Sequence, residues 1–157
     1  MLTTLPFLLF YFSLTAFLVY ADIRYGQLPD KFLCPLLWVG LLFQLCIHPD
    51  FLPSAVVGAM AGYVSFAVIY WGYRFFFRRE GMGYGDVKYL AALGAWHGWC
   101  VLPLLALVAA LMALLCLLIL ALVHPDKQTL KNPLPFGPFL AAAGLCVGWE
   151  SLINFPL

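Results

Sequence analysis

Six long runs of apolar residues divide the chain, and short polar segments separate them. An α-helix needs roughly 20 apolar residues to cross a bilayer, and about 17 to 25 are tolerated. We therefore predict six transmembrane helices, of which the third is long enough to tilt and the fourth is short. They cover residues 5–21, 32–47, 52–77, 87–99, 102–123 and 138–153. The expected fold is an all-α integral membrane bundle, built as a single transmembrane domain over residues 1–157.

The composition supports a membrane environment. Of the 157 residues, 65% are hydrophobic and 10% are charged, whereas a soluble domain is about half apolar and a quarter charged. A soluble fold of this size leaves too much of its area exposed to hide so much apolar surface, so membrane lipid is the expected surrounding. The formal net charge of +1 provides no basic field for phosphates, and we expect no nucleic-acid partner.

The basic residues predict how the chain crosses the membrane. All eight Lys and Arg lie in or beside the first, third and fifth loops between the predicted helices: Arg24, Lys31, Arg74, Arg78, Arg79, Lys88, Lys127 and Lys131. Cytoplasmic loops of membrane proteins carry an excess of Lys and Arg. We therefore predict that the odd-numbered loops are cytoplasmic and that both termini face the opposite side.

Glycines recur at a spacing of four in three predicted helices. The pairs are Gly58 with Gly62, Gly94 with Gly98, and Gly144 with Gly148. Small residues at this spacing let two helix backbones approach closely in lipid, so the pairs predict a tight bundle. The alternative is that glycine is simply common in membrane helices.

Two of the seven acidic residues stand out because they border apolar segments. Asp22 ends the first apolar run, and Asp86 begins the fourth. The predicted topology places both on the cytoplasmic side at similar depth. A carboxylate within a span costs about 2.5–3.5 kcal/mol, so two of them in a small protein favour a functional role.

A pair of carboxyl groups suits hydrolysis of a peptide bond. Two close carboxyls do not ionise together easily, so they share a proton. The ionised member can take a proton from water, while the protonated member polarises the carbonyl. Gly83 and Gly85 have no Cβ and would let an extended substrate pass close to the backbone. The structural alternatives are that Asp22 caps a helix or pairs with Arg24, and that Asp86 is a helix N-cap.

Three segments carry recognisable motifs in a definite order. They read D-I-R-Y-G-Q-L-P-D at 22–30 followed by C-P-L-L-W at 34–38, E-G-M-G-Y-G-D-V-K at 80–88 followed by A-A-L-G-A-W at 91–96, and P-F-G-P at 135–138. In these segments, which are spread over nearly the whole chain, the sequence resembles the type IV prepilin peptidases. These enzymes are membrane aspartyl proteases with a G-x-G-D motif.

The resemblance implies that Asp22 and Asp86 are the catalytic pair, and that Gly83, Gly85, Lys88 and Asp30 bind or position the substrate. An alternative role for Lys88 is that of an interfacial lysine reaching toward the membrane surface. The implied substrates are prepilins and pilin-like secretion subunits (pseudopilins). Their basic leaders would be removed at the cytoplasmic face of the bacterial inner membrane, without a cofactor.

The cysteines depart from one pattern of that family. Many bacterial members carry an N-terminal cytoplasmic region with two C-x-x-C pairs, which is associated with N-methylation of the new amino terminus. This sequence begins with a membrane helix and contains no C-x-x-C, so we expect cleavage, and this departure puts methylation in doubt. We interpret its five cysteines as small buried apolar side chains. A Cys46–Cys100 bridge is an alternative.

A non-enzymatic transporter or assembly scaffold is the competing interpretation, because intramembrane carboxylates also serve ion and proton pathways. A transporter would spread polar residues through the bilayer, but charge here gathers on one side, apart from Glu150. We interpret His97 as an interfacial residue in an aromatic belt with Trp96 and Trp99. No three histidines or cysteines form a plausible metal site, and we expect no metal.

Overall fold

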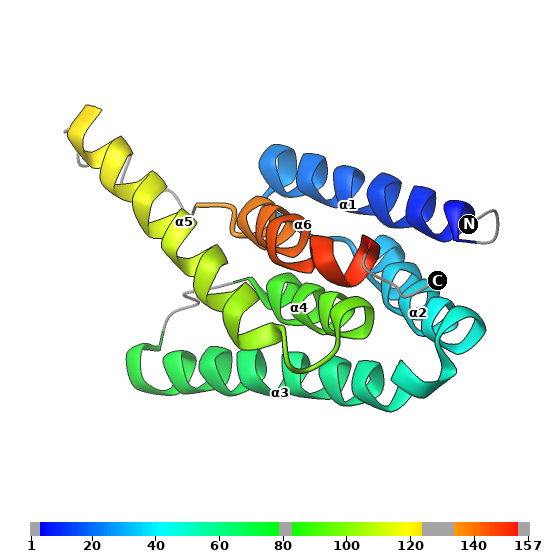
Figure 1. Cartoon of the computed structure of the whole chain (residues 1–157). Coiled ribbons are helices and arrows are strands. Elements are labelled where there is room, and N and C mark those ends of the chain that lie inside the picture. The colour runs from blue at the N-terminus through cyan, green and yellow to red at the C-terminus, as the bar shows by residue number, and fades with distance from the viewer. Residues whose placement is uncertain (1–3, 79–82, 124–133, 154–157) are drawn as a thin grey trace.

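The computed structural model describes residues 4–78, 83–123 and 134–153. Within these ranges the chain forms six α-helices and one short 3-10 helix, with no strand, which confirms the predicted all-α class (Figure 1). The elements are α1 (Leu5–Tyr25), α2 (Asp30–Ile47), η1 (Pro49–Phe51), α3 (Leu52–Phe77), α4 (Tyr84–His97), α5 (Leu102–Val123) and α6 (Gly137–Ile153).

Glycine and proline set the helix ends that shape the site. Helix α1 ends at Gly26, which has a φ of 61° and donates its N–H to the Asp22 carbonyl at 2.8 Å. Glycine is favoured at this position because it adopts the left-handed conformation without a steric cost. Pro29 then directly precedes α2 with an extended backbone. The short linker between Gly26 and Pro29 therefore joins two neighbouring helices at one end of the bundle.

Four helical segments in the described part of the chain are long and apolar enough to cross a membrane. They are α1, α2, η1 with α3, and α5, and they agree with four of the six predicted spans. Helix α4 has 14 residues, or about 21 Å at 1.5 Å per residue, which is less than the roughly 30 Å of a bilayer core. The shorter apolar stretch in α6 runs from Gly137 to Gly148.

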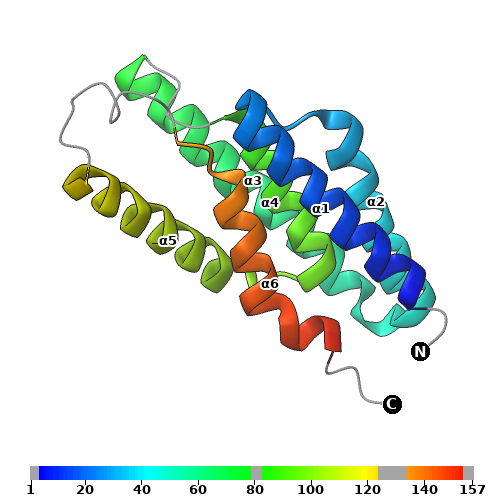
Figure 2. The same cartoon turned by 90° about the horizontal axis from the view of Figure 1, so that it is seen from above.

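Helix α4 occupies the centre of the bundle. It packs against α2, α3, α5 and α6, and Figures 1 and 2 show it surrounded by the longer helices. Nearly all of its side chains from Asp86 to His97 are buried. A helix enclosed in this way does not have to span the lipid itself, because its neighbours separate it from the membrane.

The predicted glycine contacts are confirmed within the helices, whereas Gly98 lies just after α4, where a Cβ would meet Phe51 and Ser54. The α3 and α4 backbones meet at Gly58 and Gly94, where a Cβ on either residue would collide with the other's backbone. A Cβ on Gly62 would lie 2.8 Å from the Leu90 carbonyl oxygen. In α6, Gly144 and Gly148 likewise lie against α4 side chains. Small residues thus allow close packing on two sides of α4.

The prediction that Trp96 and His97 belong to an interfacial belt is wrong. Both are 1% exposed, because α4 ends inside the bundle, among α1, α2 and α6. Trp96 donates its indole N–H to the Leu36 carbonyl at 2.9 Å. The His97 ring lies against Gly148, and its Nε2 is 3.4 Å from the Tyr11 hydroxyl. Trp99, two residues beyond the helix, is exposed as expected for a belt residue.

The interpretation of the cysteines as buried is also wrong. All five are free thiols; Cys116 is half-buried, and Cys34, Cys46, Cys100 and Cys146 are exposed on the outside of the bundle. The Cys46–Cys100 alternative is therefore not formed. Small apolar side chains on this surface need no protein neighbours, because in a membrane bundle the lipid covers them.

Candidate active site

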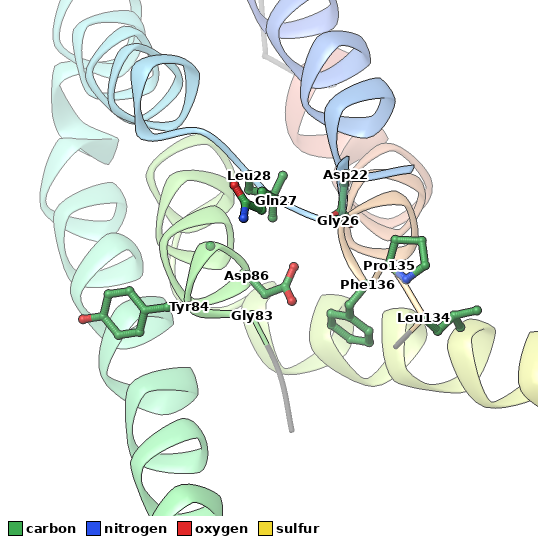
Figure 3. A pocket seen from close by; sticks show the side chains of 11 residues that line it. Asp22, Gly26, Gln27, Leu28, Gly83, Tyr84, Asp86, Leu134, Pro135 and Phe136 are labelled. Carbon is green, nitrogen blue, oxygen red and sulfur yellow. The ribbon is translucent and has the colours of Figure 1, made fainter. Parts of the chain in front are cut away.

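A cavity of about 430 Å³ lies at the end of the bundle where α1 ends and α4 and α6 begin. Three segments distant in sequence form its walls: the end of α1 with its linker, the start of α4, and the residues that precede α6 (Figure 3). The lining residues are Asp22, Gly26, Gln27, Leu28, Gly83, Tyr84, Gly85, Asp86, Leu134, Pro135 and Phe136. Both predicted catalytic aspartates therefore line the same cavity.

Asp22 lies in the last turn of α1, on the helix face that also buries Thr15 and Leu18. It is 6% exposed. Its Oδ2 accepts a hydrogen bond from the backbone N–H of Gly137 at 2.8 Å. Asp22 thus accepts the first N–H of α6, which agrees with the helix-capping alternative, and it does not pair with Arg24.

Asp86 is the third residue of α4, so it is not the N-cap that the sequence had offered as an alternative. The N-cap is Gly83, whose carbonyl accepts the Asp86 N–H at 3.1 Å. The Asp86 side chain is 5% exposed, and its Oδ1 has no hydrogen-bond partner among the described residues. Buried carboxylate oxygens are usually paired. Asp86 thus shares the cavity with the Asp22 carboxyl, while its own Oδ1 lacks a partner among the described residues.

The two glycines of the G-x-G-D motif have different surroundings. A Cβ on Gly83 would meet only the Asp86 Oδ2, at 3.6 Å, so this residue leaves the cavity open. A Cβ on Gly85 would lie 2.7 Å from the Leu28 Cβ. Gly85 therefore lets the α1–α2 linker pack directly against the first turn of α4. One glycine faces the site, and the other brings two of its walls together.

Lys88 and Asp30 form an ion pair beside the cavity. The Lys88 Nζ is 2.7 Å from both carboxylate oxygens of Asp30 and 5.3 Å from the centre of the Tyr84 ring. Neither charged residue lines the cavity. The pair joins the first residue of α2 to the first turns of α4, close to Asp86. The sequence had named both residues without indicating that they contact each other.

Sequence reasoning also missed several parts of the site. The donor at Gly137 and the walls at Gln27, Leu28 and Tyr84 were not predicted. The P-F-G-P motif could have pointed to this segment, because residues 135–138 were part of the family resemblance. No role had been assigned to them. Among the described residues, no group of three His, Cys, Asp or Glu side chains is placed to hold a metal ion.

Comparison with known protein families identifies the family of this chain. The model of the type IV leader peptidase family matches residues 9–122, a range that contains both aspartates of the cavity. The chain belongs to the type IV leader peptidase family. It is thus a leader peptidase with several membrane-crossing helices, and family membership disfavours the transporter or scaffold interpretation.

Individual relatives agree with this assignment. Leader peptidase HopD of Escherichia coli is 56% identical over 150 residues, which is 96% of each chain. Leader peptidase HopD of Salmonella typhimurium is 56% identical over 157 residues, or 99% of each chain. The prepilin leader peptidase/N-methyltransferase of Aeromonas hydrophila is 45% identical over 150 residues, but the match covers only 49% of that protein. No solved structure gives a significant match.

Proposed function

We propose that this leader peptidase uses Asp22 and Asp86 as its catalytic pair. The observation that carries the proposal is that two buried carboxyl groups, from helices far apart in sequence, line one small cavity. Two carboxyls in such a site share one proton, because they do not ionise together easily. The ionised carboxylate takes a proton from the attacking water. The protonated one polarises the scissile carbonyl and then donates to the leaving amine.

The cavity suits an extended peptide better than a helix. Its walls near Gly83 and the Gly26–Pro29 linker are non-helical backbone, and Gly83 adds no side chain there. A peptide bond must be exposed from its helix before water can attack it. We propose that the substrate is extended where it passes Gly83, and that Gly85 and the Asp30–Lys88 pair keep the surrounding walls in place.

The substrates that we propose are prepilins or pilin-like secretion subunits, cleaved at the cytoplasmic face of the bacterial inner membrane. Two basic residues, Arg24 and Lys31, flank the α1–α2 linker at the cavity end of the bundle. An excess of basic residues favours a cytoplasmic location for that end. With α4 and α6 counted as crossings, both termini would face the opposite side of the membrane. A basic leader would then reach the cavity from the cytoplasm.

The test is cleavage of a prepilin-type substrate in membranes. Native protein is compared with Asp22→Asn and Asp86→Asn at matched expression. The control is Asp50→Asn, because Asp50 lies in η1, before the first residue of α3, and does not line the cavity. We expect native protein and the control to remove the leader, and both site variants to be inactive. Full cleavage by either site variant would refute the pair, and no cleavage of several prepilins by native protein would refute the substrate class.

A further inference from the structure

The start of α6 contacts the candidate catalytic carboxylate directly. Gly137 is the first residue of α6 and lies 115 positions after Asp22 in the chain, yet its N–H donates to the Asp22 Oδ2 at 2.8 Å in a buried setting. Hydrogen bonds with an ionised partner are about twice as strong as neutral ones. The N–H groups in the first turn of a helix are also suited to a negative group, because they lack partners within the helix.

The space around Gly137 admits no side chain while Asp22 stays in place. A Cβ at position 137 would lie 2.6 Å from the Asp22 Oδ2 and 3.2 Å from its Cγ. Gly137 does not have a positive φ, in contrast to Gly26 and Gly98. The backbone conformation therefore does not require glycine at this position. The requirement comes from the close approach of the carboxylate.

The donor is held in place by packing that does not involve Asp22. The Phe136 carbonyl accepts the N–H groups of Phe139 and Leu140 at 3.1 and 3.2 Å, which fixes the first turn of α6. The Phe136 ring packs near Phe66 of α3, with ring centroids 6.3 Å apart, and Leu140 is completely buried. The start of α6 thus acts as a fixed point against which the Asp22 side chain is oriented.

We propose that Gly137 is a positioning residue of the peptidase. Its N–H holds the Asp22 Oδ2 toward α6, and this leaves Oδ1 available to water and substrate in the cavity that Asp22 lines together with Asp86. The residues at the start of α6 then serve the site in two ways. Pro135 and Phe136 line the cavity (Figure 3), and Gly137 holds one carboxylate. This inference rests on the proposed role of Asp22 in catalysis.

The first test is Gly137→Ala, with Gly72→Ala as the matched control. A Cβ on Gly72 in α3 would meet nothing within 4 Å. In Gly137→Ala the obstacle is the end of a short side chain, so Asp22 rotates away while the bundle stays folded. We expect kcat for leader cleavage to fall about tenfold or more, because small misplacements of reacting groups are costly. KM should stay within about twofold of native, and the thermal unfolding midpoint should fall by only about 2–4 °C, because one buried hydrogen bond is lost. Native kcat in Gly137→Ala would overturn the proposal.

The second test removes the hydrogen bond without adding a methyl group. Glycolic acid at position 137 replaces the peptide N–H by an ester oxygen, and we again expect kcat to fall about tenfold, as for a lost charge-assisted hydrogen bond. This variant also decides the question if Gly137→Ala does not fold. Native kcat in the ester variant would show that the N–H does not position Asp22.

A third measurement does not depend on activity, so it separates this inference from the proposed function. Amide hydrogen exchange at Gly137 is compared in native protein, Asp22→Ala and Asp86→Ala. We expect about tenfold faster exchange in Asp22→Ala alone, because only that variant removes the acceptor. Equal exchange in all three would refute the contact, even if the native enzyme cleaves prepilins. Faster exchange with an active Asp22→Asn enzyme would instead refute the catalytic role.

Discussion

Asp30 and Lys88 could either position the site or bind the substrate, and the sequence could not distinguish these two roles. Because the two residues form an ion pair, changing their charges can distinguish them. Both residues are partly exposed, with side-chain exposures of 60% and 33%. An exposed pair contributes about 0.2–1 kcal/mol to stability, so Asp30→Asn or Lys88→Gln should leave the bundle folded. Lys88 lies two residues after Asp86, however, and its anchor on α2 helps to place that first turn. A displacement of about 1 Å at a reacting group can cost about a hundredfold in rate.

We therefore expect each single variant to lose less than about 1 kcal/mol of unfolding free energy, but about tenfold or more in kcat/KM for leader cleavage. The decisive variant is the swap, Asp30→Lys with Lys88→Asp, which restores the pair with its charges reversed. If the pair positions α4, the swap recovers activity to within about fivefold of native, which corresponds to about 1 kcal/mol.

Proteoliposomes with a purified prepilin substrate provide the assay, and thermal unfolding of the same samples provides the stability control. A swap that is as inactive as the single variants would show that one of the charges contacts the substrate. Single variants with native activity would refute both roles.

Three further predictions concern packing around the site. Gly85→Ala should lower the unfolding free energy by about 1–3 kcal/mol, because the added Cβ clashes with Leu28. In a double-mutant cycle, Leu28→Gly in the same chain should recover part of that loss. Additive effects of the two substitutions would refute the contact. Gly94→Ala should lower the thermal midpoint of unfolding, because its Cβ meets the α3 backbone, which cannot rotate away. Gly72→Ala should not lower it. Equal midpoints would refute the close approach of the α3 and α4 backbones. Tyr89→Phe should lower the unfolding free energy by about 1 kcal/mol, because the buried Tyr89 hydroxyl interacts with the buried Thr15 side chain; an unchanged or higher unfolding free energy would refute that interaction.

Much of the membrane architecture follows from the sequence, because the free-energy cost of placing an apolar or a charged segment in the wrong solvent depends on that segment alone. An exposed apolar run in water, or a carboxylate in lipid, is expensive whatever the neighbouring helices do. The extents of α2, α3 and α5 were therefore predicted closely, and Asp22 and Asp86 could be chosen from seven acidic residues. The glycine pairs also predicted tight helix contacts, although not which helices would meet.

Other features depend on which helix lies at the centre, and that is a property of the whole bundle. The apolar composition of α4 does not distinguish an enclosed helix from one that faces lipid, and only its short length separates it from the other spans. Trp96 and His97 were for this reason assigned to the membrane interface, although α1, α2 and α6 cover them. The cysteines were misassigned for the same reason, since lipid and protein interior both accept small apolar side chains.

The contacts that complete the site join residues far apart along the chain. The sequence by itself determined the membrane character, the family resemblance and the two candidate carboxylates, because each depends on local composition or on a short motif. Only the tertiary structure brought Gly137 to Asp22, Lys88 to Asp30 and Leu28 to Gly85. Those contacts depend on where the helices stand relative to one another, which is decided by the packing of all of them around α4.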